Sequence, residues 1–438
     1  MSGEVQRSLS FTKRQLPLFF SITTQPLLLM QIEKEDGMRR SVNNDDAVHK
    51  ETRFGESNAS KRIYCRSDVA AVRADPSVAR IVQTELPICG RASQLARSRR
   101  ERIVERRWSK IERSSSTGPF AAEEGGDLAM RVRVLGSSAG GGFPQWNCNC
   151  SNCRAVRSGL PGFTARTQSS VAVSADGASW LLLNASPDLR HQIGQMPDLA
   201  PSAAEGVRAT PIKAVALTNG DVDHVAGLLN LREAQPFSLY GSRRVLDALK
   251  ANTIFDILAP QVVARTELPL GAPIEIHGAG IDLGLAIEAF AAPGKIALYL
   301  EDADAADFGT RTGDTLGLRV IEIASGKSFF YIPGCARLDE PLAQRIKGAS
   351  LVLFDGTLWS ETEMIEKGLM AKTGSRMGHI NMSGPDGSIA AFADLGVARK
   401  IFVHINNSNP VLDAGSRERA AAEAAGWEIG FDGMEIAL

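Results

Sequence analysis

Two carboxylates and a histidine follow an apolar run near the middle of the chain, and together they could bind a metal ion. The run Ile212–Leu217 has the composition of a buried strand, and Asp221, Asp223 and His224 come shortly after it. Polar groups at the carboxyl end of a buried strand often form a binding site in α/β proteins. The alternative is that Asp223 caps the helix that begins near Val225, with His224 incidental.

Two more histidines occupy positions where such a site could find ligands. His404 ends the apolar segment Ile401–Val403 and is followed by a polar turn that contains Asn407. His379 lies in a glycine-rich loop that enters a helix, where an imidazole could transfer protons. A histidine in either place can also be purely structural, bonded to nearby backbone, so the sequence alone leaves both readings open.

Three cysteines lie close together on a loop that follows a glycine-rich stretch. Cys148, Cys150 and Cys153 supply three thiolates, and two cysteines separated by two residues have a spacing typical of tetrahedral zinc sites. The alternative is a set of free thiols or a redox pair. We expect a structural zinc ion here, with a fourth ligand that the spacing does not identify.

Alternating strands and helices are expected from Met130 onward, and they must position these groups. Many strands are apolar on both faces, which is typical of a sheet covered on both sides. The pattern predicts an α/β fold, a four-layer αβ/βα sandwich. The predicted strands are 132–137, 169–174, 180–184, 214–218, 281–291, 316–323, 328–332, 351–354 and 401–404, and the predicted helices are 223–234, 243–251, 338–347, 387–395 and 416–425.

Composition divides the 438 residues into two parts. Residues 1–129 are rich in arginine and show no sustained periodicity, so we expect a poorly ordered extension that stands outside the core. Residues 130–438 are expected to form one domain, and Met130 resembles a natural start, so one interpretation of the extension is a start-site artefact. The net charge of −1 gives no reason to expect nucleic acid or membrane as a partner.

The compartment is expected to be the cytoplasm. No run of about 20 apolar residues is present, and the segment Leu16–Met30 is interrupted by polar residues and lacks a clear cleavage site. Six cysteines, three of them clustered, do not form a disulfide framework.

The order of these elements resembles the metallo-β-lactamase superfamily, and several motifs resemble one family within it. The motifs are Asn147-Cys148-Asn149-Cys150-x-x-Cys153, Asn184-Ala185-Ser186-Pro187-Asp188, Asn219-x-Asp221-x-Asp223-His224 and His404-Ile405-Asn406-Asn407-Ser408-Asn409-Pro410. They are similar to those of the coenzyme PQQ synthesis protein B family. The resemblance runs from Met130 to Leu438.

The resemblance implies a reduced set of metal ligands. Asn219 and Asp221 stand where hydrolases of the superfamily have histidines, and Cys335 stands where they have a bridging aspartate. Asp223, His224 and His404 are retained, and they belong to a single metal position. Two histidines and a carboxylate with open positions suit non-haem Fe(II), although zinc is the alternative metal.

The remaining residues receive supporting roles in this interpretation. Asp221 is expected as a fourth ligand or a catalytic group that orients water, and His379 as the catalytic proton-transfer residue. Asn219, Cys335 and Asn407 are expected to support the ligands, and Asn407 stands where related hydrolases have the histidine that completes the zinc site. Arg376 and Lys372 could receive a substrate carboxylate.

The function implied by the resemblance is a step in the synthesis of pyrroloquinoline quinone. The implied reaction is Fe(II)- and O2-dependent hydroxylation of the tyrosine in a Glu-Tyr precursor, so the partner is a small molecule or dipeptide. One alternative is a soluble carrier for transport of the cofactor or its precursor to the periplasm. Another is a zinc-dependent hydrolase. A homodimer is left open.

Overall fold

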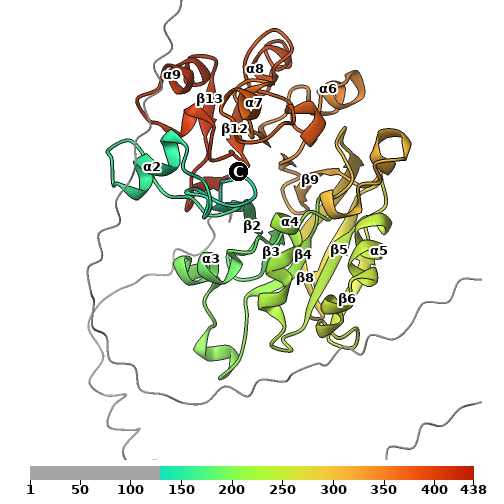
Figure 1. The fold of residues 1–438 in the computed structure, drawn as a ribbon. Helices are drawn as coiled ribbons and strands as arrows, with labels where there is room; N and C mark the ends of the chain where they lie inside the picture. The colour runs from blue at the N-terminus through green and yellow to red at the C-terminus, as the bar shows by residue number, and fades with distance from the viewer. Residues whose placement is uncertain (1–128) are drawn as a thin grey trace, which may run out of the picture. The chain divides into compact units, whose positions relative to one another are not determined.

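Residues 129–438 form a sandwich of two seven-stranded sheets in the computed structural model, which describes this part of the chain (Figure 1). The predicted arginine-rich extension lies outside the described residues, apart from residue 129. The four-layer α/β sandwich predicted from the sequence pattern is confirmed.

The first sheet has the strand order β14-β1-β2-β3-β4-β5-β6. Strands β3 to β6 run parallel to one another, whereas β14, β1, β2 and β3 pair antiparallel. The bounds are β1 Arg131–Gly136, β2 Ser170–Ser174, β3 Trp180–Leu183, β4 Ile212–Ala216, β5 Phe237–Gly241, β6 Val263–Glu267 and β14 Glu435–Ala437.

The second sheet has the order β13-β12-β11-β10-β9-β8-β7 and repeats this plan. Strands β10 to β13 are parallel, and β7 to β10 pair antiparallel. The bounds are β7 Ile274–Gly278, β8 Ile281–Ala291, β9 Leu316–Glu322, β10 Ser328–Ile332, β11 Leu351–Asp355, β12 Arg399–Val403 and β13 Trp427–Ile429.

Three buried clusters hold the layers together. Val132, Val173, Leu285 and Val403 belong to the cluster between the two sheets, where each strand contributes alternate side chains. A second cluster lies between the first sheet and helices that include α3 and α5, and a third lies between the second sheet and helices that include α6, α8 and α9. The α-helices are α2 Ser151–Arg157, α3 Leu189–Gln195, α4 Val222–Val225, α5 Arg243–Ala251, α6 Glu340–Ile346, α7 Glu363–Glu366, α8 Ser388–Ala391 and α9 Arg417–Ala424.

The predicted strands all occur, with ends that differ by a few residues, but five more strands were not predicted from the sequence: β5, β6, β7, β13 and β14. The predicted helix 223–234 is wrong in its extent. Helix α4 ends at Val225 and continues as the 3₁₀-helix Ala226–Leu231, because Gly227 packs directly against the backbone of residues 185 and 186. The described helices include none that is both long and apolar enough to cross a membrane.

Candidate metal centre

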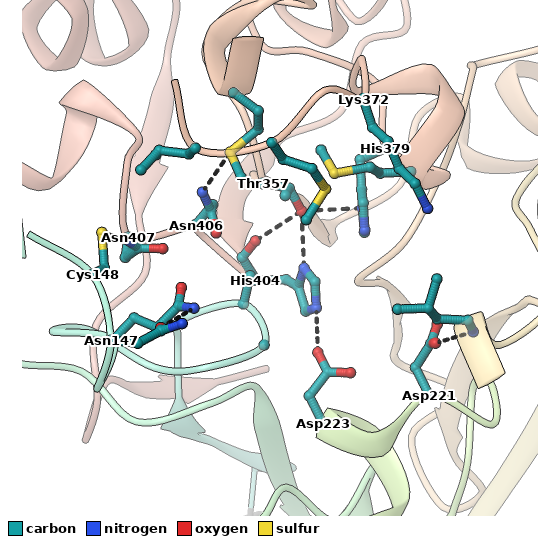
Figure 2. A pocket seen from close by; sticks show the side chains of 18 of the residues that line it. Asn147, Cys148, Asp221, Asp223, Thr357, Lys372, His379, His404, Asn406 and Asn407 are labelled. Atoms are coloured by element: carbon teal, nitrogen blue, oxygen red, sulfur yellow. Dashed lines mark hydrogen bonds and ion pairs between the residues drawn. The ribbon is translucent and has the colours of Figure 1, made fainter. Parts of the chain in front are cut away.

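A cavity of about 450 Å³ opens where strands β4, β11 and β12 end, and most of the predicted site residues line it (Figure 2). Asp223, His224, His404 and His379 all line it, and the imidazoles of His379 and His404 stack with centroids 5.1 Å apart. In Figure 2 His404 lies between Asp223 and Thr357. The carboxyl ends of strands from both sheets therefore meet at one site, as expected for an α/β protein.

The turn after β4 is fixed by hydrogen bonds rather than by a helix cap. Asn184 accepts from the backbone N–H of Thr218 at 2.9 Å and donates to its hydroxyl at 2.9 Å. The carboxylate of Asp223 makes no capping hydrogen bond to α4. Its Oδ2 instead lies 3.1 Å from His404 Nε2, so the capping alternative is not supported.

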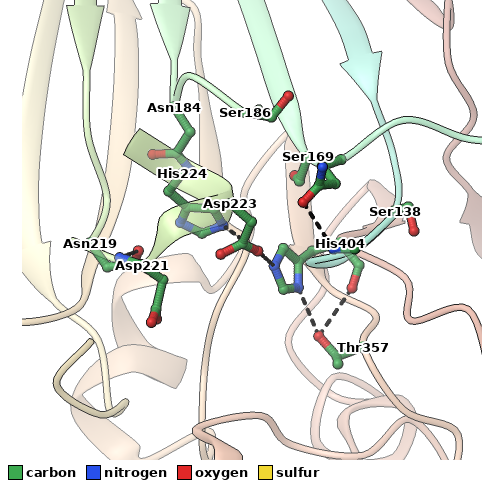
Figure 3. Close-up of polar contacts among 12 residues, drawn as sticks. Ser138, Ser169, Asn184, Ser186, Asn219, Asp221, Asp223, His224, Thr357 and His404 are labelled. Atoms are coloured by element: carbon green, nitrogen blue, oxygen red, sulfur yellow. Dashed lines mark hydrogen bonds and ion pairs between the residues drawn. The ribbon is translucent and has the colours of Figure 1, made fainter. Parts of the chain in front are cut away.

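Asp223, His224 and His404 bring three ligand atoms within 4.8 Å of one another (Figure 3). His224 Nε2 lies 3.7 Å from Asp223 Oδ2, and the two imidazoles meet edge to face with centroids 5.2 Å apart. His224 Nε2 is buried and has no hydrogen-bond partner among the described residues. Because a buried polar atom without a partner is costly, a metal ion held between these three groups accounts for it.

The electrostatics of the group favour ligation. Burial lowers the pKa of His224 to about 4 against the opposing charge of Asp223, so its imidazole is neutral at physiological pH. Burial alone would raise the pKa of Asp223, but His224 and His404 lower it below its usual range. The pKa of His404 is raised because its hydrogen bond and ion pair with Asp223 outweigh burial. Because the Asp223 carboxylate can only accept, the proton of this contact lies on His404 Nε2, and a metal would have to displace it.

Asp221 does not join this group of ligand atoms. Its Oδ1 accepts a hydrogen bond from the backbone N–H of Leu298 at 3.0 Å, and its Oδ2 lies 3.4 Å from Lys295 Nζ. Asn219 accepts from the backbone N–H of Asp221 at 3.0 Å and so braces the turn. The structure places Asp221 in the cavity wall, where its carboxylate contacts Lys295 and the backbone of Leu298 rather than the histidines.

His379 is held by the carboxylate of a buried aspartate. Its Nδ1 lies 2.7 Å from Oδ2 of Asp355, which is fully buried. Asp355 also accepts from the backbone N–H groups of Cys335 and Thr357, at 2.8 and 3.0 Å. Because the carboxylate can only accept here, His379 donates its Nδ1–H, and Nε2 remains for proton transfer in the cavity.

The Thr357 hydroxyl connects this pair to the ligand His404. Its oxygen lies 2.6 Å from Asp355 Oδ1, 2.9 Å from His404 Nδ1 and 3.1 Å from His379 Nδ1. Asp355, His379 and His404 also bring ligand atoms within 4.8 Å of one another, but this hydroxyl lies within hydrogen-bonding distance of all three. Since Thr357 donates to Asp355, it accepts from His404 Nδ1–H, which leaves His404 Nε2 to face Asp223.

The sequence contained a signal for Asp355 and Thr357. Both follow β11, which is parallel to β12, the strand that His404 follows. Parallel neighbours end at the same edge of a sheet. Cys335 supports Asp355 through its backbone, while its thiol contacts Arg337 O at 3.0 Å and has a pKa raised by burial.

The three clustered cysteines bring their sulfur atoms together, as predicted. Asn407 Nδ2 lies 3.1 Å from Cys148 Sγ, 3.2 Å from Cys153 Sγ and 3.7 Å from Cys150 Sγ. Burial raises the pKa of Cys153 to about 11, so zinc would have to displace its proton. Rotation of the Asn407 amide would direct its oxygen toward the three sulfurs, at the position of a fourth ligand.

Comparison with known proteins gives matches over the described part of the chain. A model described as a beta-lactamase superfamily domain matches residues 179–405. Coenzyme PQQ synthesis protein B from Xanthomonas oryzae pv. oryzae (strain MAFF 311018) is 50% identical over 309 residues, which is 70% of this chain and 100% of that protein. The protein of the same name from Gluconacetobacter diazotrophicus is 52% identical over 304 residues, covering 69% of this chain and 98% of the relative.

Comparison with solved structures also finds a protein of this name and a second protein with a similar fold. The crystal structure of Zn(2+)-bound PqqB from Methylobacterium extorquens is 50% identical, with a TM-score of 0.66, and the match covers 70% of this chain and 100% of that one. A diphosphatase from the PhnP family matches with a TM-score of 0.50 over 71% of this chain and 98% of its own, but at 19% identity it shows similarity of fold alone.

Proposed function

Because the chain belongs to the coenzyme PQQ synthesis protein B family, with a metallo-β-lactamase fold, it takes part in the synthesis of pyrroloquinoline quinone, and we propose that its step is an oxidation. In this proposal Asp223, His224 and His404 hold one Fe(II) ion, and the tyrosine of a Glu-Tyr precursor is hydroxylated with O2. The observation that carries the proposal is the unpartnered, buried Nε2 of His224 beside the other two donors.

The donor set fits such an ion. Two imidazoles and one carboxylate with open positions are a known arrangement for Fe(II) in enzymes that use O2. The relative from Methylobacterium extorquens was crystallised with Zn(2+), which supports metal binding in the family. When bound, the iron would activate O2; one oxygen atom enters the ring, and the other leaves as water with two electrons from an external reductant.

The protein's own groups prepare the substrate for this step. His379 is oriented by Asp355, so its Nε2 can accept and return the proton of a tyrosine hydroxyl. Thr357 keeps the tautomer of His404 that presents Nε2 to the ligand group. Met364, Leu369 and other apolar side chains line the cavity and would displace water from around an aromatic ring.

A separate structural zinc ion is part of this proposal. Cys148, Cys150 and Cys153 would hold it beside Asn407, and Cys148 and Asn407 also line the cavity. A zinc ion there would fix the loop before α2 to the rim of the site without taking part in the chemistry.

The test is a mass measurement. The full chain, loaded with Fe(II) without oxygen, is mixed with Glu-Tyr dipeptide, ascorbate and O2, and the mass of the dipeptide is followed. We expect a gain of one oxygen atom on the tyrosine ring, abolished in His404→Ala and retained in His277→Ala, because His277 is an exposed residue of β7 outside the cavity. An unchanged mass with tightly bound dipeptide would instead favour a carrier.

A further inference from the structure

Two lysines line the cavity, and their charges are not equally balanced. Lys295 lies 3.4 Å from Oδ2 of Asp221, its Nζ also donates to the carbonyl of Ile296 at 3.2 Å, and both side chains are largely buried. One cation therefore faces one anion. Lys295 is a neutralised part of the wall with little capacity to attract a further anion.

Lys372 is the more weakly paired of the two lysines. Its one ion pair among the described residues is with Glu301, and Lys372 Nζ lies 3.8 Å from Glu301 Oε2, beyond hydrogen-bonding distance. Arg376 already binds Glu301 through both guanidinium nitrogens, at 2.7 and 3.3 Å, and stacks over Phe308 with its guanidinium 3.5 Å from the ring centroid. Arg376 thus occupies both oxygens of Glu301, and Lys372 has only a longer ion pair with it. Lys372 lines the cavity whereas Arg376 does not, so the more weakly paired ammonium borders the cavity.

Glu301 stays ionised in this arrangement. The hydrogen bond from Arg376 lowers its pKa, although burial acts in the opposite direction. The same hydrogen bond raises the pKa of Arg376. The pair is therefore charged over the physiological range, and Arg376 remains bound to both carboxylate oxygens of Glu301.

The wall close to Lys372 is apolar. Met364, Met370 and Met377 line the cavity together with Leu369 and Leu298. Thioethers contact aromatic rings favourably and adapt to the shape of the ring. Figure 2 shows Lys372 and His379 on the side of the cavity across from Asp223, so a ring held between them and the metal ligands would have a cation at its edge.

We propose that the cavity recognises an aromatic carboxylate, with the ring against the methionines and a carboxylate on Lys372. The inference rests on the proposed function only for the identity of the ligand, a dipeptide with a tyrosine ring and two carboxylates. Lys372 then determines specificity, because a partly buried ammonium attracts a carboxylate more strongly than a neutral amide. Lys295 serves as a wall residue.

The experiment measures binding without turnover. The full chain is saturated with Zn²⁺, which has no redox chemistry, and titrated by calorimetry with three ligands: Glu-Tyr, Glu-Tyr amide and Gln-Tyr. The amide lacks the terminal carboxylate and Gln-Tyr lacks the side-chain carboxylate, so the two carboxylates are distinguished. We expect either Glu-Tyr amide or Gln-Tyr to bind about tenfold or more weakly than Glu-Tyr, as for loss of a charge-assisted hydrogen bond.

The variants identify the group responsible. Lys372→Met should weaken binding of Glu-Tyr by a similar factor and abolish the preference between the ligands, whereas Lys372→Arg should keep it. Glu301→Gln should tighten binding of Glu-Tyr, because it removes the negative charge of the carboxylate that pairs with Lys372. Lys327→Met, at an exposed turn between β9 and β10, is the matched control and should change nothing.

Equal affinities for the three ligands in the wild type, or a preference that persists in Lys372→Met, would overturn the proposal. No binding of Glu-Tyr would overturn it as well. If the preference is present and depends on Lys372 but no oxygen is added with Fe(II), then the carboxylate site stands and the hydroxylase does not.

Discussion

His404 has an unusual backbone conformation, and its side chain contacts both Asp223 and Thr357 in the site. Its φ is +56°, a region that costs a residue with a Cβ atom roughly 1 kcal/mol or more. Asn184, which braces the turn after β4, is also left-handed, with φ of +63°. Both residues follow a strand directly, and hydrogen bonds from their side chains to Thr357 and Thr218 hold them there. This strain serves to turn His404 into the cavity immediately after β12.

The Thr357 hydroxyl should control metal affinity without touching the metal. Thr357→Val removes the acceptor of His404 Nδ1–H and leaves Asp355 Oδ1 with one donor fewer. Loss of such a partner typically weakens metal binding by about 10- to 100-fold. Competition with a metal-binding dye measures the affinity. Thr357→Ser keeps the hydroxyl and should restore most of it, whereas equal affinities in Val and wild type would contradict this orientation of His404.

The candidate ligands could be predicted from the sequence because each follows an apolar strand and is a type that binds metals. Asp355 and Thr357 have the same position relative to β11, but an Asp-Gly-Thr sequence is also typical of a turn. Their role depends on contacts between segments more than 20 residues apart, such as Asp355 with His379, and local pattern does not encode these. For the same reason the sequence could not show that Asp221 faces Lys295.

At the scale of elements, Gly227 fixes how closely α4 can approach the loop after β3. A Cβ on Gly227 would lie 2.1 Å from the carbonyl oxygen of Ser186 and 2.8 Å from the backbone of Ala185. Two hydrogen bonds, from Gly227 N–H to Ala185 and from Ala185 N–H to His224, join the same segments. The close approach therefore positions His224 directly.

Gly227→Ala should lower both stability and metal content. The added methyl meets backbone that cannot move aside, which costs about 1–3 kcal/mol, and shifts His224 away from Asp223. Urea unfolding and metal analysis measure the two effects. Gly194→Ala is the matched control, because Gly194 lies in α3 with open space at its Cβ, so alanine should be neutral or slightly stabilising. Full metal content in Gly227→Ala would refute this role.

Glu363, at the start of α7, gives the protein a pH dependence of known sign. Its side chain is buried, and burial raises the pKa of its carboxyl despite hydrogen bonds from Ser408 and Trp359. A carboxyl whose pKa is raised by folding contributes stability that is fully present below its unfolded pKa and is lost as pH rises through the folded pKa. Glu363→Gln has no such titration and can still accept from Trp359 N–H.

The wild type should therefore lose stability relative to Glu363→Gln as pH increases from 5 to 8. Urea unfolding of both proteins at several pH values measures it, and titrations elsewhere cancel in the difference. If the wild type keeps or gains stability relative to the variant over this range, then ionisation of Glu363 does not destabilise the fold.

Elements with strong local patterns could be predicted closely, and β8, β10 and α5 have the predicted bounds. Strand β14 is only three residues long, with Ile436 alone buried, and it forms by pairing with β1 at the other end of the domain. Strands β5 to β7 are short, and β6 and β7 have several exposed residues. Their pairing depends on neighbours in the sheet rather than on their own sequence, so periodicity does not reveal them.

At the scale of the whole molecule, the cysteine cluster joins the beginning of the domain to its end. Cys148, Cys150 and Cys153 lie in and before α2, and Asn407 follows β12, more than 250 residues later. Asn152 adds hydrogen bonds to the carbonyls of Asn407 and Asn409, at 3.2 and 2.9 Å. The domain organisation predicted for residues 1–129 stays a prediction, but within residues 129–438 this junction closes the sandwich beside the metal centre.

If this junction holds zinc, zinc content and stability should change together. Cys148→Ser removes one thiolate and should lose zinc, and with it the stabilisation that a bound ion adds, about 2.7 kcal/mol when free zinc exceeds the dissociation constant a hundredfold. Asn407→His supplies an imidazole and so completes a set of three cysteines and one histidine, which should bind zinc more tightly than the wild type. Asn407→Ala leaves three thiolates and should bind less tightly.

Zinc analysis and thermal unfolding, with and without a chelator, separate these cases. The order of melting temperature should be Asn407→His, wild type, Asn407→Ala and Cys148→Ser, and the chelator should bring the four proteins closer together. Because the cluster borders the cavity through Cys148 and Asn407, chelation should also weaken ligand binding there. Retained zinc in Cys148→Ser, or melting temperatures that a chelator leaves unchanged, would mean that packing and the Asn152 hydrogen bonds alone close the molecule.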